Sequence, residues 1–162
     1  MRRMLTAALA LLLILALCGC GKQDGPDISM YDLCKAMSSS GSFGDMKYAS
    51  SEDSNAAELL ANVSNLEYSK VRAFFIYYAA EGRGNADEIV VIRVRDSKDA
   101  RAAEETLSSH LSKRKALYAS YDKSQVPKLD KARVFRDGSF AVLIVSEAPE
   151  TAEKAFREFI RK

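Results

Sequence analysis

The sequence predicts an α+β domain with an antiparallel four-stranded sheet and helices mainly on one face. Two features predict the sheet: two runs rich in β-branched and aromatic residues flank a glycine-containing turn at residues 82–85, and two further runs flank Asp137-Gly138. A third feature places the helices, because each pair of runs is followed by a segment with helical spacing of apolar residues. The order β-β-α-β-β-α, after N-terminal helices, favours hairpins packed against helices.

Two helices are expected before the first hairpin. The first begins at a cap on Asp27 or Ser29, and its apolar residues share one face at i, i+3, i+4 and i+7 spacing: Met30, Leu33, Cys34 and Met37. The second is shorter and lies within residues 51–63. Residues 43–48 fit neither a helical nor a strand period clearly, so no element is assigned there.

The first hairpin is expected to comprise residues 71–80 and 88–95. In its second strand, alternate residues from Val90 to Val94 form an apolar face, whereas the other face becomes charged toward its end. The turn at residues 82–85 (GRGN) resembles the start of a phosphate-binding loop. The third glycine and the following helix of that motif are absent, so we expect a tight turn.

A long helix is expected to follow the first hairpin. It begins at a cap on Asp96 or Ser97 and ends near Tyr121, which makes it about 36 Å long at roughly 1.5 Å per residue. A connection that contains Pro127 then leads to the second hairpin.

The second hairpin is expected over residues 133–136 and 139–146. Asp137-Gly138 between them predicts a type I′ turn, in which both central residues adopt positive φ. Residues 140–145 are apolar on both faces, which predicts a central strand. The last helix begins within residues 146–149, and its buried face is expected to comprise Ala152, Ala155, Phe156, Phe159 and Ile160.

The beginning of the chain carries a targeting signal rather than a structural element. Arg2 and Arg3 precede an uncharged apolar run that ends in Leu17-Cys18-Gly19-Cys20, and this order of residues is that of a lipobox. In a lipobox the Cys thiolate takes a diacylglyceryl group. The chain therefore divides into a lipoprotein signal peptide, a polar tether and a single α+β domain: residues 1–19, 20–27 and 28–162.

Two alternatives to lipoprotein processing fit the sequence less well. A membrane-spanning helix needs about 20 apolar residues, and this run ends sooner, at Gly19, Gly21 and Lys22. A simple secretory signal favours two small residues in an A-x-A pattern, which Leu17 does not fit. We therefore expect a protein held at the cell membrane, on its extracytoplasmic side, by a diacylglyceryl anchor on Cys20.

The net charge argues against a nucleic-acid partner, and the cysteine content argues against an internal disulfide. The chain has 24 Lys and Arg against 22 Asp and Glu, and removal of Arg2 and Arg3 with the signal peptide leaves 22 of each. A neutral domain has no electrostatic reason to bind nucleic acid, so none is expected. With Cys20 acylated, Cys34 has no partner for an internal disulfide. We interpret Cys34 as a buried, inert thiol rather than a reactive one.

No catalytic residue, metal site or cofactor is predicted. His110 is the sole histidine, no G-x-S-x-G nucleophile motif is present, and one His with one free Cys is too few for a zinc site. His110 is therefore interpreted as a structural or surface residue. The acidic residues are interpreted as solvated charges by default; Glu88, at the start of a predicted strand, has the alternatives of pairing with Arg83 or capping a loop.

One possible binding surface lies on the charged face of the first hairpin. Arg93 and Arg95 point to that face, and Tyr77 and Arg133 are expected near them in the same sheet. If helices cover only the opposite face, these residues form a cationic and aromatic surface for a small anionic ligand or an envelope protein. The alternative is a solvated sheet face on which the Arg side chains cover apolar surface.

The chain from Ala86 onward resembles a family of bacterial lipoproteins that is classed only as a domain of unknown function, number 4358. The resemblance lies in Ala86-Asp87-Glu88-Ile89 with the strand that follows, in the long helix that ends at Tyr121, and in Gln125-Val126-Pro127. The final hairpin, the acidic C-terminal helix and residues 71–80 also fit, whereas residues 38–65 resemble the family less. The resemblance implies a short lipid-anchored domain without an assigned activity.

These observations together predict a non-enzymatic binding or interaction domain at the cell envelope. One alternative is a small substrate-binding accessory subunit of a transporter, although two-lobed binding proteins are much longer than the 143 residues from Cys20 to the end. An envelope hydrolase is the other alternative, and the lack of a convergent catalytic set disfavours it.

Overall fold

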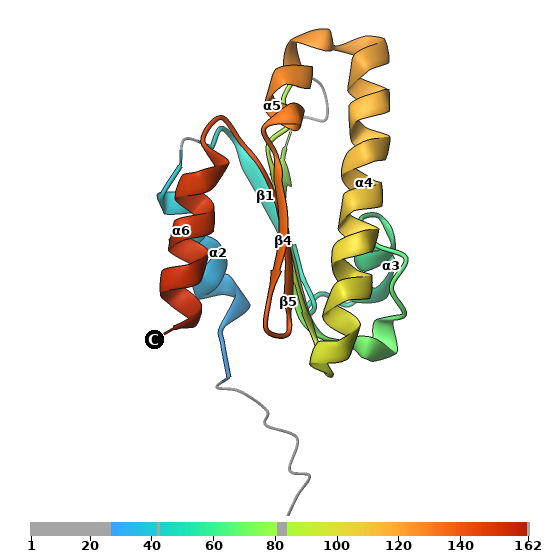
Figure 1. Cartoon of the computed structure of the whole chain (residues 1–162), viewed down its shortest axis with the longest axis vertical. Helices are drawn as coiled ribbons and strands as arrows, with labels where there is room; N and C mark the ends of the chain where they lie inside the picture. The colour runs from blue at the N-terminus through green and yellow to red at the C-terminus, as the bar shows by residue number, and fades with distance from the viewer. Residues whose placement is uncertain (1–26, 42, 81–83, 162) are drawn as a thin grey trace, which may run out of the picture.

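The computed structural model describes residues 27–41, 43–80 and 84–161, so the predicted signal peptide and Cys20 lie outside the described residues. Its centre is a five-stranded, fully antiparallel sheet in the order β1-β2-β3-β5-β4 (Figure 1). The strands are β1 (Met46–Ser50), β2 (Val71–Ala79), β3 (Glu88–Val94), β4 (Arg133–Asp137) and β5 (Phe140–Val145). The α+β class is confirmed, and the expected number of four strands is one too few.

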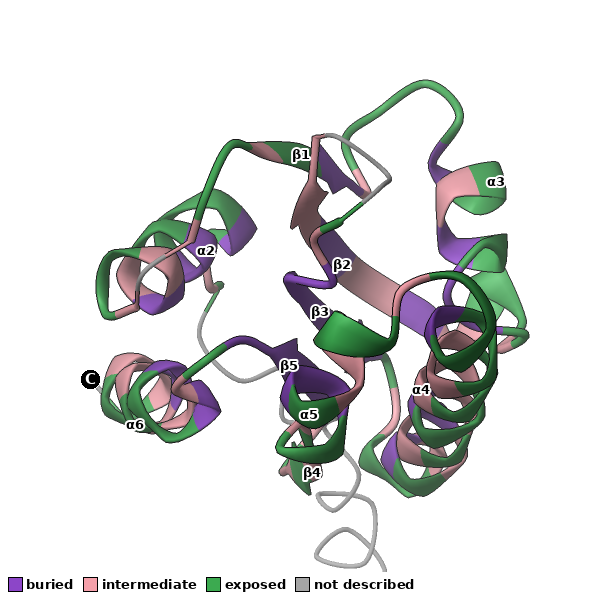
Figure 2. Ribbon diagram, turned by 90° about the horizontal axis from the view of Figure 1, so that it is seen from above, coloured by how far each residue is buried: buried purple, intermediate pink, exposed green. Residues whose placement is uncertain are grey.

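Helices cover both faces of this sheet. The α-helices are α2 (Met30–Ser39), α3 (Ala56–Ala61), α4 (Ala100–Tyr121), α5 (Val126–Asp130) and α6 (Pro149–Ile160). Helices α2 and α6 lie together on one face, and α3 and α4 lie on the other (Figures 1 and 2). The prediction that helices lie mainly on one face is therefore wrong.

The central strands explain why two helical layers are needed. Strands β3 and β5 are buried along their whole length, and each places apolar residues on both faces of the sheet. Alternate β3 residues therefore enter two separate cores: Val90 and Ile92 pack beneath α4, whereas Ile89 and Val91 pack beneath α2 and α6. One helical layer would have left the second apolar face in water.

Strand β1 is the one strand, among the described residues, that the sequence did not predict. It pairs with β2 from Met46↔Ala79 to Ser50↔Phe75 and forms one edge of the sheet. Its first three residues are half-buried or exposed, and its last two are buried. Five residues on an edge give too short an alternation for a period of two to stand out.

The predicted helices are confirmed, with small shifts at their ends. Ser29 caps α2, because its hydroxyl accepts a hydrogen bond from the Asp32 N–H at 3.2 Å. Cys34 is buried in the α2 core, and burial raises the pKa of its thiol to about 12, as expected for an inert thiol. None of the helices within the described residues has the length and hydropathy to span a bilayer.

The second hairpin is confirmed, but its turn differs from the prediction. Asp137 pairs with Phe140, so the two central residues are Gly138 and Ser139 rather than Asp137 and Gly138. Gly138 has a φ of 55°, and no non-glycine residue among those described has positive φ. A glycine at the first central position is the pattern of a type II′ turn, which also matches the twist of a hairpin.

Candidate functional site

The site begins with three polar side chains that meet between β3 and α4. Glu88 is the first residue of β3 and lies two residues before Val90, so its side chain points to the same face, toward α4. His110 and Arg114 are four residues apart on α4, which places them on one side of that helix. These three residues are called the Glu88 cluster below.

The Glu88 cluster is buried and closely paired. Glu88 Oε2 lies 3.0 Å from His110 Nε2 and 2.7 Å from Arg114 Nη1, and the Glu88 side chain is 7% exposed. Burial disfavours the ionised form of Glu88, but the hydrogen bond from His110 and the charge of Arg114 outweigh it and hold the pKa of this carboxyl below its ordinary value. The lowered pKa therefore favours the ionised form of Glu88, and two groups contact its Oε2.

A cavity of about 370 Å³ opens beside the Glu88 cluster and is called the α4 cavity. Helix α4, the α3 region and the β1–β3 part of the sheet form its walls. Its polar lining residues are the Glu88 cluster with Asn62 and Asn85. The rest of its lining is apolar or aromatic: Ala49, Leu59, Val63, Ile76, Tyr78, Ala79, Leu117, Tyr118 and Tyr121.

A second, smaller cavity adjoins the first. It has a volume of about 110 Å³ and shares Asn62, Val63 and His110 with the α4 cavity. Lys113 contributes a further positive charge to its lining. The two cavities therefore meet around His110, and cationic groups lie on both sides of it.

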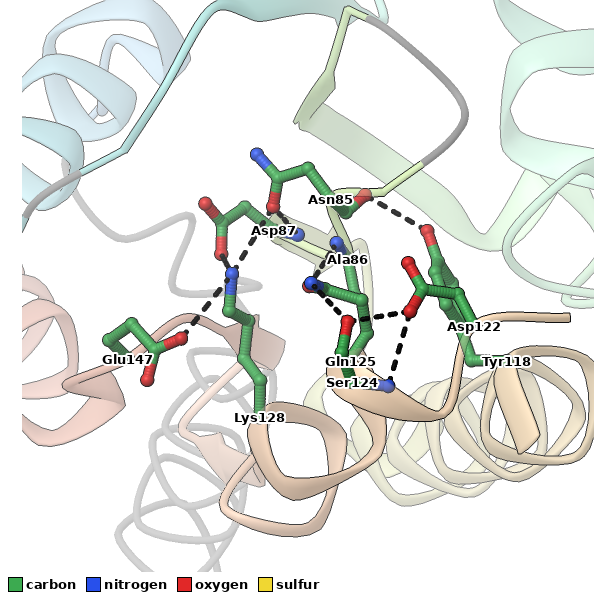
Figure 3. Close-up of polar contacts among 9 residues, drawn as sticks. All are labelled: Asn85, Ala86, Asp87, Tyr118, Asp122, Ser124, Gln125, Lys128 and Glu147. Carbon is green, nitrogen blue, oxygen red and sulfur yellow. Dashed lines mark hydrogen bonds and ion pairs between the residues drawn. The ribbon is translucent and has the colours of Figure 1, made fainter.

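A hydrogen-bond network fixes the rim of the α4 cavity (Figure 3). The Tyr118 hydroxyl donates to the Asn85 carbonyl at 2.9 Å, and the Ala86 N–H donates to the Gln125 side-chain oxygen at 3.1 Å. Buried Lys128 places Nζ 2.8 Å from Asp87 Oδ1 and 3.3 Å from Asn85 Oδ1. The segment before β3 is thus tied to α4 and α5, next to the lining residues Asn85 and Tyr118.

Short helix α5 makes this network possible, and it was not predicted. Pro127 lies in its first turn, where the missing N–H needs no partner. The helix buries Leu129 and most of Lys128. Two segments that carried the family resemblance, residues 86–89 and 125–127, meet here through the bond between Ala86 and Gln125.

The predicted surface of Arg93, Arg95, Tyr77 and Arg133 does not form. Helices α2 and α6 cover this face of the sheet, so the premise of an open face is wrong. Arg93 is 4% exposed and lies over the Phe140 ring, whereas Arg95 bonds the Ser69 carbonyl beyond the end of β3. Tyr77 and Arg133 share a row of the sheet but are separated by β3 and β5.

The structure places His110 and Glu88 side by side. His110 pairs with a buried carboxylate, which is compatible with the structural interpretation of this residue. Glu88 pairs with groups on α4; the expected alternative, Arg83, lies outside the described residues. Two spacings in the sequence could have indicated the cluster: Glu88 shares the period of Val90, and His110 and Arg114 are four residues apart.

The α4 cavity can bind a ligand through its chemistry. Most of the lining is apolar, tyrosines supply flat rings with hydroxyl groups, and the Glu88 cluster supplies charged groups. Among the described residues, no group of three His, Cys, Asp or Glu side chains is arranged to hold a metal ion.

Comparison with known proteins identifies the family. The sequence profile of a domain of unknown function (DUF4358) matches residues 44–146, which is more than half of the chain. Neither the curated proteins nor the solved structures contain a match. The matched segment includes all five strands, α3, α4 and α5, and therefore every residue of the Glu88 cluster and the α4 cavity. The chain belongs to the DUF4358 family.

Proposed function

We propose that this protein is a lipid-anchored, extracytoplasmic binding domain that receives a small ligand in the α4 cavity. The α4 cavity is the observation that carries the proposal. Its volume of about 370 Å³ lies within the range of roughly 300–1,000 Å³ that small-molecule sites occupy. Such sites are mostly apolar and carry a few fixed polar groups, which describes this lining.

The lipobox supports the location. Leu17-Cys18-Gly19-Cys20 places an acylated cysteine seven residues before Asp27, where the described chain begins. The chain enters the domain at α2, which belongs to the helical layer opposite α3 and α4 (Figure 1). An anchor attached to the α2 layer leaves the layer with the α4 cavity free to meet a ligand.

The protonation state of Glu88 favours binding over acid–base catalysis. Its pKa is lowered, so it holds no proton to donate at neutral pH. Its carboxylate already accepts hydrogen bonds from His110 and Arg114, which makes it a weak base. The cluster therefore supplies a fixed, charged wall rather than a proton-transfer group.

A single tryptophan can test ligand binding, because the chain contains none. Leu117 lines the cavity and is 57% exposed, so Leu117→Trp places a fluorophore at the rim. We expect the neutral probe 3-phenylpropionamide to shift its emission saturably in full-length protein held in lipid nanodiscs. Tyr31→Trp, on α2 at a site 63% exposed, is the matched control and should not respond. Equal responses, or none, would contradict a site in this cavity.

A labelled fatty acid tests the anchor. Cells that express the wild-type chain should incorporate the label and retain the protein in the membrane fraction. Cys20→Ser should abolish the label, because serine lacks the thiolate that is acylated, whereas Cys34→Ser should not change it. Label retained by Cys20→Ser would refute the anchor and leave ligand binding as a separate question.

A further inference from the structure

Charge within the α4 cavity narrows the class of ligand. Among the described residues that line it, Glu88 and Arg114 carry full charges and His110 is titratable. His110 Nε2 and Arg114 Nη1 both contact the same Glu88 oxygen, Oε2, and the charges of Glu88 and Arg114 offset each other. What the cavity can still offer an ionic ligand is therefore the set of Arg114 N–H donors that Glu88 does not use.

Arg114 is held so that only part of its hydrogen-bonding capacity is used. A guanidinium group has five N–H donors in a planar fork, and the described bond to Glu88 uses Nη1. The group also lies 5.5 Å from the centre of the Tyr118 ring. These two contacts fix its plane, and a planar guanidinium is the group best suited to bind a carboxylate through two parallel hydrogen bonds.

A cationic ligand fits less well, although tyrosines line the cavity. Such a ligand would need the Glu88 carboxylate, which is 7% exposed and engaged at 2.7 Å by Arg114. It would also approach Arg114 itself and, beyond His110, Lys113. Like charges in a site of low dielectric repel strongly, so the aromatic faces alone do not favour a cation.

The remaining walls require an apolar body on the ligand. Leu59, Ile76 and Leu117 come from three different elements, and the rings of Tyr78 and Tyr121 complete this part of the lining. An inorganic anion has no apolar surface to bury against these walls, so its binding would gain nothing from the hydrophobic effect.

We propose that the α4 cavity binds a small organic monocarboxylate with an aromatic or aliphatic body, whose carboxylate pairs with Arg114. This inference rests on the proposed function, because it names the ligand class of the same cavity. The carboxylate and Glu88 then share Arg114, with His110 beside them.

Three probes of one shape test the ligand class: 3-phenylpropionate, 3-phenylpropionamide and 3-phenylpropylamine. Titration calorimetry on the full-length protein in nanodiscs, with empty nanodiscs as the blank, should show the acid binding at least about tenfold tighter than the amide. The amine should show no saturable binding. Equal affinities, or a preference for the amine, would overturn the monocarboxylate proposal and leave a binding cavity; failure of all three probes would overturn the binding function as well.

Two substitutions with opposite expected effects sharpen this test. Glu88→Gln keeps the shape of the side chain but removes the competing negative charge, so affinity for the acid should rise about tenfold while the amide is unchanged. Arg114→Met should lower affinity for the acid to that of the amide. A fall in acid affinity in Glu88→Gln protein whose circular dichroism matches the wild type would contradict the proposal. The wild-type ranking of the three probes stands independently if Arg114→Met fails to fold.

A fourth probe, N-acetylphenylalanine, tests whether the carboxylate belongs to a free small molecule or to the C-terminus of a peptide. It presents the acid as the C-terminus of a peptide, whereas 3-phenylpropionate presents it as a free small molecule. We expect the free acid to bind more tightly, because the extra amide would meet the apolar wall unpaired. Tighter binding of N-acetylphenylalanine would replace the small-molecule assignment with a peptide C-terminus.

Discussion

The two faces of the sheet differ in how their aromatic rings and ion pairs are packed. On the α2/α6 face, Phe135 and Phe140 both pack edge-to-face against Phe156, and the ion pairs of Arg157 lie at the periphery. On the α3/α4 face, the Glu88–Arg114 ion pair is buried and a cavity remains open beside it. A buried ion pair adds little net stability over an apolar core. The second face therefore carries a feature that packing alone does not require.

The lengths of the helices help to explain why a cavity remains on the α3/α4 face. On the α2/α6 face, two helices of 10 and 12 residues cover the strands between them. On the other face α4 has 22 residues, but its neighbour α3 has only 6. Helix α3 contributes only Leu59 to the lining of the α4 cavity, Asn62 and Val63 follow it, and β1 and β2 contribute Ala49, Ile76, Tyr78 and Ala79. Function is thus expected where the helical layer is incomplete.

The largest change in the free energy of unfolding is expected from a substitution on the α2/α6 face. Phe156→Ala removes a fully buried ring from the aromatic cluster and should lower the free energy of unfolding by about 3–5 kcal/mol. Chemical denaturation of the full-length protein measures this change, and Phe156→Leu should recover most of it. Ligand affinity in the folded fraction should stay unchanged, because Phe156 belongs to the other core. A loss below about 1 kcal/mol would show that this face is not the main source of stability.

The next largest effect is expected from replacing arginines, and the loss in free energy of unfolding should differ between the two faces. Arg114→Met leaves Glu88 buried without its closest cationic partner and should destabilise the protein by about 3 kcal/mol. Arg157→Met, on the α2/α6 face, breaks pairs that are partly exposed and should cost about 1 kcal/mol. Arg101→Met is the exposed control on α4, with a side chain 75% exposed, and should cost less than about 0.5 kcal/mol. Equal losses for all three would remove the distinction between the faces.

The free energy of unfolding at acidic pH tests whether Glu88 is ionised in the folded protein. A carboxyl whose pKa is lowered in the folded state contributes stability above its ordinary pKa of 4.5, and this contribution is lost as pH falls through the folded pKa. Glu88→Gln should therefore be less stable than the wild type at pH 7, and the difference should shrink below about pH 4.5.

Denaturation midpoints at pH 7 and at acidic pH measure that difference. Glu153→Gln is the matched control on α6, because the pKa of Glu153 is also lowered: partial burial opposes ionisation, and hydrogen bonds from Arg157 and Arg133 outweigh it. Its effect should have the same sign and be smaller, since its partners are more exposed. A difference that widens at acidic pH would mean that Glu88 is protonated in the native state.

The smallest effect is expected at the rim of the cavity. Leu117→Ala removes an exposed side chain and should change the free energy of unfolding by less than about 0.5 kcal/mol. The same change should weaken binding of 3-phenylpropionamide, because it removes part of the apolar wall. Unchanged affinity would place the probe deeper in the cavity, away from the rim.

Local sequence patterns were sufficient for most of the elements. The period of α2, the β-branched runs of β2 and β3 and the glycine of the second hairpin each depend on neighbouring residues, so they could be predicted without the fold. Strand β1 and helix α5 have five residues each, which is too short for a period to emerge. The hairpin turn was misplaced by one residue because the pairing of Asp137 with Phe140 depends on register.

The site depended on contacts that no local pattern contains. Glu88 lies 22 residues from His110 and 26 from Arg114 in the chain, and only the packing of α4 onto β3 brings them together. The rejected surface of Arg93 and Tyr77 failed for the same reason, since α2 and α6 cover it from both ends of the sequence.

By itself, then, the sequence determined the α+β class and most helices and strands, because these depend on residues close together in the chain; acylation of Cys20 stays a prediction from the sequence. Only the tertiary structure decided which faces are covered, where a cavity remains and that Glu88 is a buried, ionised carboxylate. The physical reason is that burial and ion pairing are properties of distant segments brought into contact, and their free energies exist only after the layers have packed.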